Sequence, residues 1–279
     1  MSLYIVATPI GNLDEISKRA IAVLAESEII LCEDTGNTKV LLKNIDAPFK
    51  KLVSYHKFNE LARQDFILDK LKLGTAVALV SDAGTPCISD PGYRLVEAAA
   101  REGITVIGVN GPCALVSAVA VSGFPAEPFV YIGFLPKKDI LKTISPLLYN
   151  ERVFVFYESP LRIYKSIKAL ADNFPDISLC LCNDLTKKYE RIYRGSPAEV
   201  LNELDENPHF EKGEYTCVVY NPGKYTKNRE ADLPSLESLI VDTMVKSSCT
   251  MKSAVKALAQ DYRKNELYAA SLRLKDLIK

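Results

Sequence analysis

Short apolar runs alternate with longer amphipathic stretches through the first half of the chain. The apolar runs have the length and branching of buried strands, and they fall at Leu3–Ala7, Glu28–Cys32, Lys51–Ser54, Val77–Val80 and Ile104–Gly108. Between them, apolar side chains recur at helical spacing around Ile16–Leu24, with Asp14 and Glu15 in the expected first turn, and helices are expected over Asn59–Leu73 and Tyr93–Arg101. Strands that alternate with helices predict an α/β domain with a parallel sheet.

The second half has a different pattern. It predicts strands at Phe129–Phe134, Arg152–Tyr157, Ile177–Cys182, Tyr189–Arg194 and Tyr215–Tyr220. Helices are expected over Ala114–Ser122, around Ile163–Leu170, and after Ser196, which reads as an N-cap followed by Pro197. These elements predict a second α/β domain with a mixed sheet.

The last part of the chain is predicted to be helical. A polar linker is expected over Tyr225–Leu233, and helical patterns follow at Ser235–Met244, Thr250–Ala259 and Asn265–Ile278. They predict a small bundle that resembles a helix-turn-helix. The predicted division is therefore an N-terminal α/β domain over 1–118, a second α/β domain over 119–223, and a linker with a helical domain over 224–279.

Polar loops follow the strands of the first domain. The stretch Ser81-Asp82-Ala83-Gly84-Thr85-Pro86 comes directly after the apolar run Val77–Val80, which has the pattern of a buried strand. Ligands of open α/β sheets bind at the carboxyl ends of the strands, so this loop is a candidate binding site. Asp82 supplies a charge there, and Gly84 permits close approach of the backbone.

Composition narrows the function classes. The 35 basic and 35 acidic residues cancel, but basic residues outnumber acidic ones after Gly223, which points to a polyanionic partner. The seven cysteines form no Cys-x-x-Cys pair, and with only two histidines we expect reduced thiols in a cytoplasmic protein and no metal site. No apolar run is long enough to span a membrane. Rossmann and P-loop glycine motifs are also missing.

Several ordered blocks resemble a known family. They are Val6–Leu13, Glu33-Asp34-Thr35, Ser81–Tyr93 and Phe156–Pro160, and Leu185–Lys188, Gly213-Glu214 and Arg263–Tyr268 extend the match along nearly the whole chain. The sequence resembles the ribosomal RNA small subunit methyltransferase I family, part of the tetrapyrrole methylase superfamily. The resemblance implies two α/β domains of tetrapyrrole methylase type with a helix-turn-helix-like appendage.

The resemblance also implies an activity and its partners. The expected enzyme is a homodimer that uses S-adenosylmethionine to methylate a cytidine ribose 2′-hydroxyl in the decoding region of 16S rRNA of the small ribosomal subunit. The residues expected to bind the cofactor lie in the matching blocks and loops: Pro9, Gly11, Ser81, Asp82, Ala83, Gly84, Thr85, Pro86, Gly111, Pro112, Tyr157, Glu158, Ser159 and Thr186.

A ribose hydroxyl is a poor nucleophile at neutral pH and benefits from a positioned base. Four carboxylates in the predicted cleft loops are candidates, and their spacing does not choose among them: Glu33, Asp34, Asp82 and Glu158. The structural alternatives are that Asp82 caps its own turn and that Glu158 caps the helix after Pro160.

Basic side chains are the candidates for contacts with RNA phosphates. They are Lys137, Lys138, Arg162, Lys187, Lys188, Arg263 and Lys264. The sequence departs from the family pattern at three places that bear on the target: Gly36 in place of Arg, Asn110 and Cys113 around Gly111-Pro112, and Asn183-Asp184 in place of Arg-Glu.

Two other functions fit parts of the sequence. Superfamily members that methylate carbon atoms of porphyrins and corrins would have a large apolar cleft and would not require the basic C-terminal part. Alternatively, the chain could be an RNA-binding module that has lost catalysis, with Gly36 and Asn110 as traces of that loss.

Overall fold

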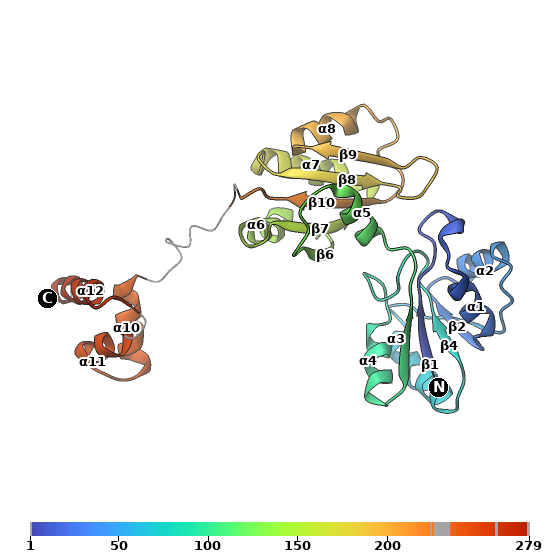
Figure 1. Cartoon of the computed structure of the whole chain (residues 1–279), viewed down its shortest axis with the longest axis horizontal. Coiled ribbons are helices and arrows are strands. Elements are labelled where there is room, and N and C mark those ends of the chain that lie inside the picture. Colours follow the sequence, from blue (N-terminus) through green and yellow to red (C-terminus); the bar gives the residue numbers. More distant parts are fainter. Residues whose placement is uncertain (1, 224, 226–234, 260–261, 278–279) are drawn as a thin grey trace. The chain divides into compact units, whose positions relative to one another are not determined.

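The computed structural model describes residues 2–223, 225, 235–259 and 262–277. The chain forms two compact units, Met1–Tyr225 and Thr226–Lys279. The larger unit contains two five-stranded sheets, each with its own apolar core (Figure 1).

The first sheet is entirely parallel, as predicted. Its strands are arranged in the order β3-β2-β4-β1-β5, with bounds β1 Ser2–Val6, β2 Ile29–Cys32, β3 Leu52–Ser54, β4 Val77–Leu79 and β5 Thr105–Val109. The carboxyl ends of all five strands therefore lie at one edge, because parallel strands run in the same direction.

Helices cover both faces of this sheet (Figure 1). Helices α3 (Glu60–Lys72) and α4 (Tyr93–Arg101) pack on one face, and α1 (Lys18–Glu26) and α2 (Thr35–Asn44) pack on the other. The expected first turn at Asp14 and Glu15 is wrong. Those residues form a separate 3-10 turn, Leu13–Glu15, and α1 begins at Lys18 because the Ser17 hydroxyl accepts the Ala20 N–H.

The second sheet is mixed, as predicted. Its order is β6-β7-β10-β8-β9, with bounds β6 Val130–Phe134, β7 Val153–Glu158, β8 Ser178–Asn183, β9 Arg191–Gly195 and β10 Tyr215–Tyr220. Only β6 and β7 pair in parallel. The predicted Ser196 cap is confirmed, because its hydroxyl accepts the Glu199 N–H in a reciprocal capping box.

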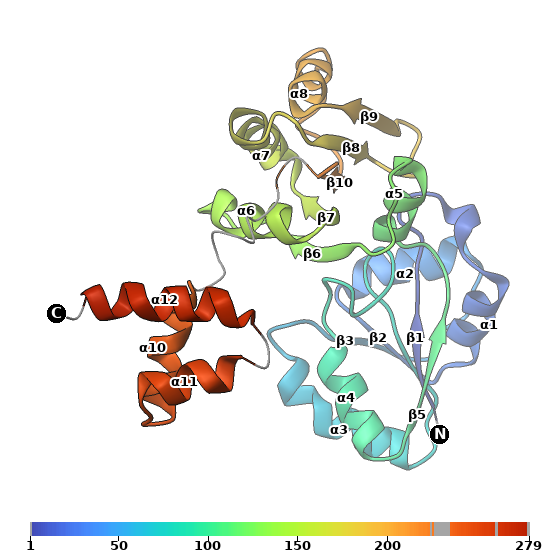
Figure 2. The same cartoon turned by 60° about the vertical axis from the view of Figure 1, so that its left-hand side comes forward.

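Helices α6 (Ile140–Asn150), α7 (Pro160–Asn173) and α8 (Pro197–Asp205) pack on one face of the second sheet, and α5 (Ala114–Ser122) packs on the other (Figure 2). Helix α5 spans the expected boundary between residues 118 and 119. Since Leu115 and Ala118 pack with Val155 and Val218 of the second sheet, we propose to assign α5 to the second lobe. Ile10 of the first lobe joins the same apolar cluster, so the two lobes share a packed contact.

The described residues of the smaller unit form a bundle of three helices. Helices α10 (Leu236–Lys246), α11 (Met251–Leu258) and α12 (Lys264–Leu277) pack around a core that includes Ile240, Ala254 and Leu267. Thr250 caps α11 through the Ser253 N–H. The expected linker lies outside the described residues apart from Tyr225, and so does Ile278. Among the described residues, no helix has the length and apolar character needed to cross a membrane.

Candidate active site

A pocket of about 420 Å³ opens where the first sheet's carboxyl edge faces the second lobe. The first lobe contributes the ends of the loops that follow β1, β2 and β4, and the second lobe contributes the ends of β6 and β7 and the start of β10. The lining residues are Ile10, Glu33, Asp82, Ala83, Gly84, Thr85, Ile88, Ser89, Asp90, Cys113, Ala114, Phe134, Tyr157, Glu158, Ser159, Pro160, Glu214, Tyr215 and Thr216.

The loop after β4 is held by backbone contacts to the loop after β1. The Thr8 N–H donates to the Gly84 carbonyl at 2.9 Å, and the Gly84 N–H donates to the Thr8 carbonyl at 3.1 Å. Gly84 has a φ of 82°, a conformation that favours glycine. The buried Ser81 hydroxyl lies 3.2 Å from the Gly84 carbonyl and reinforces the turn. The structure therefore makes this loop rigid at the pocket floor.

The loop after β5 is joined to the same floor. The Thr85 hydroxyl donates to the Pro112 carbonyl at 3.1 Å. A side chain at Gly111 would place its Cβ 3.0 Å from the Ala7 Cβ, so glycine permits this close approach. Three loops of the first lobe are thus fixed against one another.

Half of the residues expected to bind the cofactor line the pocket, namely Asp82, Ala83, Gly84, Thr85, Tyr157, Glu158 and Ser159. The other seven are absent from the described lining: Pro9, Gly11, Ser81, Pro86, Gly111, Pro112 and Thr186. Two of them support the lining through hydrogen bonds, since the Ser81 hydroxyl donates to the Gly84 carbonyl and the Pro112 carbonyl accepts from Thr85.

Tyr157 forms part of an aromatic wall. Its hydroxyl accepts the Leu115 N–H at 3.1 Å, and its ring meets those of Tyr131 and Phe134 edge to face. Burial, together with the neighbouring Tyr131, raises the pKa of the Tyr157 phenol, so it stays neutral at physiological pH. Tyr131 also meets the Ser89 hydroxyl at 2.6 Å, which links the two lobes beside the pocket.

Glu158 is buried and fully engaged. Its carboxylate accepts the Ser159 N–H at 2.8 Å and the Ser166 hydroxyl at 2.7 Å, and it forms an ion pair with Arg162 at 3.1 Å. The Arg162 guanidinium also donates to the carbonyls of Leu135 and Pro136. These contacts give Glu158 and Arg162 a positioning role at the start of α7.

Asp34 and Asp82 are tied to each other and to α2. The Asp34 carboxylate accepts the N–H groups of Gly36 and Asn37, so it is the N-cap of α2, a helix that the sequence did not predict. Asp82 accepts the Asp34 N–H at 3.3 Å and the Asn37 side-chain amide at 3.0 Å. Asp82 thus supports the cap of a neighbouring helix as well as lining the pocket.

Glu33 and Asp90 form a close carboxyl pair in the pocket wall. Each carboxyl affects the pKa of the other, and the Ser81 hydroxyl lowers the pKa of Asp90. Burial, then the charge of Glu33, raises the pKa of Asp90 to about 7. Burial and Asp82 raise the pKa of Glu33. Asp90 belongs to the Ser89-Asp90-Pro91-Gly92 motif, but sequence reasoning did not select it, because its partner lies far away along the chain.

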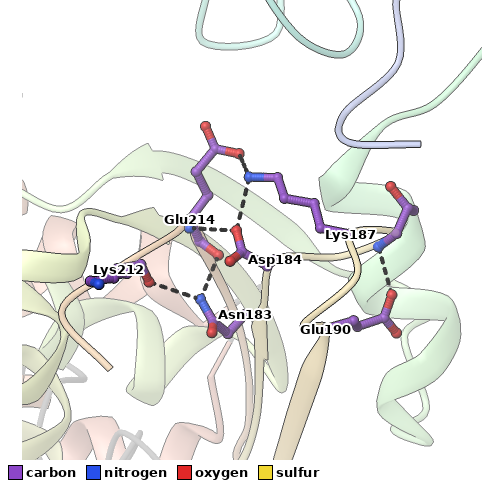
Figure 3. A network of polar contacts seen from close by, with 7 residues as sticks. Asn183, Asp184, Lys187, Glu190, Lys212 and Glu214 are labelled. Atoms are coloured by element: carbon purple, nitrogen blue, oxygen red, sulfur yellow. Dashed lines mark hydrogen bonds and ion pairs between the residues drawn. The ribbon is translucent and has the colours of Figure 1, made fainter. Parts of the chain in front are cut away.

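A second polar network is built around Lys187, and its member Glu214 lines the pocket (Figure 3). The Lys187 ammonium pairs with Asp184 at 2.8 Å and with Glu214 at 2.9 Å, and the Glu214 N–H donates to the Asp184 carboxylate. Burial lowers the pKa of Lys187, but the hydrogen bonds with Asp184 and Glu214 outweigh it and raise the pKa.

The Lys187 stem explains the glycine at position 11. A Cβ at Gly11 would lie 2.3 Å from the Lys187 Cγ, so this lysine reaches from the second lobe across the first-lobe loop. The neighbouring Thr186 has a φ of 67° and a buried hydroxyl without a hydrogen-bond partner among the described residues. Its N–H donates to Glu190. Lys187 is therefore a bridge between the lobes.

The remaining basic candidates are exposed. Lys137 and Lys138 lie in the loop between β6 and α6, and Lys188 lies after the inter-lobe network. Arg263 and Lys264 begin α12 in the smaller unit, where Arg263 lies 3.7 Å from Glu266. Lys137, Lys138 and Lys188 are not among the described residues that line the pocket.

The fold and the two-lobed site define a class of protein. Residues 2–201 match the family model for tetrapyrrole (corrin/porphyrin) methylases, so the chain belongs to the tetrapyrrole methylases. Solved structures agree on the fold. A diphthine synthase aligns with a TM-score of 0.62 at 13% identity, covering 79% of this chain and 90% of that one. Cobalt precorrin-4 methyltransferase, a cobalamin biosynthetic enzyme, aligns with a TM-score of 0.58 at 16% identity, covering 78% and 94%.

Curated relatives narrow the class to one family. The protein named ribosomal RNA small subunit methyltransferase I from Halalkalibacterium halodurans is 39% identical over 93% of this chain and 90% of its own length. Those from Vibrio cholerae (38%, covering 95% and 92%) and Escherichia coli O157:H7 (36%, covering 97% and 94%) are similar over almost the same span. The chain is a methyltransferase of the ribosomal RNA small subunit methyltransferase I family, as the sequence motifs indicated.

The carboxyl pair predicts a pH-dependent stability. Because the pKa of Asp90 is about 7 in the folded protein and 3.8 ordinarily, the folded state loses stability as pH rises between those values. The variant Asp90→Asn resembles the protonated acid and removes this loss. Its melting temperature should exceed that of the wild type by several degrees at pH 8 and by less at pH 5.

Differential scanning calorimetry at both pH values makes this comparison, with Asp69→Asn on the exposed face of α3 as the control that should show no such difference. An equal effect of Asp90→Asn at pH 5 and pH 8 would contradict the raised pKa.

Proposed function

We propose that the chain uses S-adenosylmethionine to methylate the 2′-hydroxyl of a cytidine in the decoding region of 16S rRNA, acting in the cytoplasm. The observation that carries this proposal is the acidic two-lobed pocket in a chain whose relatives are named small-subunit rRNA methyltransferases. The RNA substrate is inferred from the names of the relatives, and the use of S-adenosylmethionine as methyl donor is supported by the charge of the pocket.

The charge of the pocket fits a cationic donor. The described lining contains no lysine or arginine. It contains five carboxyl residues, Glu33, Asp82, Asp90, Glu158 and Glu214. Glu158 and Glu214 already have ion-pair partners in Arg162 and Lys187. The other three leave a negative field that a sulfonium or ammonium group would compensate. A phosphate would be repelled there, so RNA phosphates must be held outside the pocket.

The chain's own residues would bind and align the donor. The rigid floor at Gly84 and Thr85 offers backbone groups at fixed positions, and Asp82 lies beside them to receive a cation or hydroxyl. When bound, S-adenosylmethionine supplies the methyl group on a sulfonium. Transfer requires the attacking oxygen, the carbon and the sulfur to be in line, so a rigid floor contributes through positioning.

The loop after β6 is the best-supported RNA contact. Phe134, at the end of β6, lines the pocket, and Lys137 and Lys138 follow it with exposed side chains. The Arg162 guanidinium holds this loop through the Leu135 and Pro136 carbonyls. Arg162 would therefore act by holding the loop in place. Lys188, Arg263 and Lys264 stay as further proposed contacts, and Lys187 is proposed only as an inter-lobe bridge.

Helix α5 supports a homodimer. Its sequence is apolar on all sides, and Val116 and Val121 remain exposed in the single chain, with Val116 59% exposed. A helix that is apolar all round is normally covered on every side. Light scattering of the full chain should give twice the monomer mass, and a monomer at micromolar concentration would refute the dimer.

The porphyrin alternative is less well supported. It requires a large apolar cleft, whereas the described pocket lining combines carboxylates and hydroxyls with a few aromatic and aliphatic groups. The inactive RNA-binding alternative does not explain the acidic pocket, because its unpaired carboxylates would repel one another with no cationic ligand to offset the repulsion. Calorimetry with S-adenosylmethionine identifies the inactive module, which would fail to bind it, whereas binding without methyl transfer to small-subunit RNA would favour another substrate.

The proposed reaction predicts a single labelled position. Incubation with methyl-labelled S-adenosylmethionine and small ribosomal subunits that lack endogenous methylation should place the label on one cytidine ribose of the decoding region, while fully methylated subunits serve as the control. Label on a base, on no RNA, or on a porphyrin offered in parallel would contradict the proposal.

The proposed phosphate contacts predict a change in salt dependence. Neutralising both lysines in the variant Lys137→Gln/Lys138→Gln should reduce the log-log salt slope of RNA binding by about one unit for each lost contact. Filter binding at several salt concentrations measures the slope. The variant Lys165→Gln/Lys168→Gln, on the exposed face of α7, is a matched control with an unchanged slope. Equal slopes for both double variants would remove the β6–α6 loop from the RNA surface.

A further inference from the structure

Two carboxyl groups of the pocket are not occupied by the hydrogen bonds and ion pairs that hold the surrounding loops, and they are therefore able to accept a proton. Of the pocket's five carboxyl residues, Glu158 is saturated by a backbone N–H, a hydroxyl and a guanidinium. Glu214 is paired with Lys187. Asp82 accepts from a backbone N–H and a side-chain amide, one on each oxygen. A carboxylate that is occupied in this way is a poor proton acceptor, since each donor stabilises its charged form.

Glu33 and Asp90 are different. They come from the loops after β2 and β4, and both face the pocket. The two carboxyls influence each other's pKa, and the Ser81 hydroxyl lowers the pKa of Asp90. No ion pair within the described residues reaches either carboxyl. Two nearby carboxyls that repel each other are costly to ionise together, so one of them keeps its proton to a higher pH.

We propose that Asp90 is the general base that accepts the proton of the ribose hydroxyl, and that Glu33 is the positioning residue that holds it in the pocket wall. This assignment rests on the proposed function. It replaces the open choice among Glu33, Asp34, Asp82 and Glu158, because the structure uses Asp34 as a helix cap and engages Asp82 and Glu158 elsewhere.

The O–H bond of the 2′-hydroxyl breaks and its proton passes to the ionised Asp90 carboxylate, while the oxygen lone pair forms the bond to the methyl carbon and the carbon–sulfur electrons return to sulfur. Asp90 then releases the proton to water. A base must be ionised to act, and it is strongest when its pKa lies near the working pH.

The surroundings of the pair set the pH range. Burial, and then the charges of Glu33 and Asp82, raise the pKa of Asp90 to about 7, and the Ser81 hydroxyl partly opposes this rise. His56 and Lys57, from the loop after β3, partly oppose the rise in the pKa of Glu33, and Asp90 acts on the Cys87 thiol. The ionised fraction of Asp90 should therefore rise between pH 6 and pH 8, and the methyl-transfer rate should rise with it.

The test is a single-turnover pH profile with small ribosomal subunits and saturating cofactor. The wild-type rate should increase about tenfold from pH 6 to a plateau above pH 8. Asp90→Asn should lose at least 100-fold at pH 8 while its affinity for S-adenosylmethionine stays within a few-fold, and Asp90→Glu should recover part of the rate. Glu33→Gln should move the midpoint of the profile to lower pH. Asp69→Asn is the matched control with an unchanged profile.

A second readout needs no cofactor. In the free protein, the carbon resonance of the Asp90 carboxyl should titrate near pH 7, and in Glu33→Gln it should titrate at lower pH. A wild-type-like rate for Asp90→Asn, or a carboxyl that titrates near pH 4, would overturn the assignment. Methylation by the wild type together with either result would leave the proposed function intact, whereas absence of transfer by the wild type would overturn both.

Discussion

Two backbone hydrogen bonds between Thr8 and Gly84 fix the pocket on which the structure's chemistry depends. They join the loops after β1 and β4, two neighbouring strands of the parallel sheet. The Thr85 hydroxyl extends the connection to Pro112 after β5. Because the floor is built from backbone groups, the side chains above it can serve binding and proton transfer without also holding the loops together.

The carboxylates of the pocket fall into two groups, those that hold the structure through ion pairs and those without an ion-pair partner among the described residues. Glu158 and Glu214 are neutralised by Arg162 and Lys187, and these pairs hold the β6–α6 loop and the contact between the lobes. Glu33, Asp82 and Asp90 lack such partners among the described ion pairs. A cluster of this kind is unfavourable by itself, and the raised pKa of Asp90 is its signature. A cationic ligand relieves the repulsion, which is the physical link between the fold and a sulfonium donor.

Much of this arrangement could be predicted from the sequence. Buried strands such as Val77–Leu79 are continuous apolar runs, and capped helices such as α8 carry their signal in adjacent residues. The loop at Ser81–Pro86 was predicted because strand ends in a parallel sheet share one edge. Helices α2 and α6 were not predicted: α2 begins inside a polar loop at the Asp34 cap, and α6 contains Pro146, which masks its pattern.

The roles of individual polar residues could not be predicted in the same way, because they depend on partners distant in the chain. Asp34 and Asp82 are both acidic loop residues in sequence, yet only the folded chain shows that Asp34 caps α2 and that Asp82 supports it. The sequence alone predicts a phosphate contact at Lys187, but in the folded chain its ammonium pairs with Asp184 and Glu214 and its stem lies against Gly11. Asp90 became a candidate only through its proximity to Glu33.

The central claim is that the pocket's carboxylates receive a positive charge. The most direct test compares the affinities of S-adenosylmethionine and S-adenosylhomocysteine, which differ by the methyl group and its sulfonium charge, by calorimetry between pH 6 and pH 8. The account predicts that the ratio of the two affinities shifts toward S-adenosylmethionine as pH rises in the wild type, and that it stays constant in Asp90→Asn. A ratio independent of pH in the wild type would contradict it.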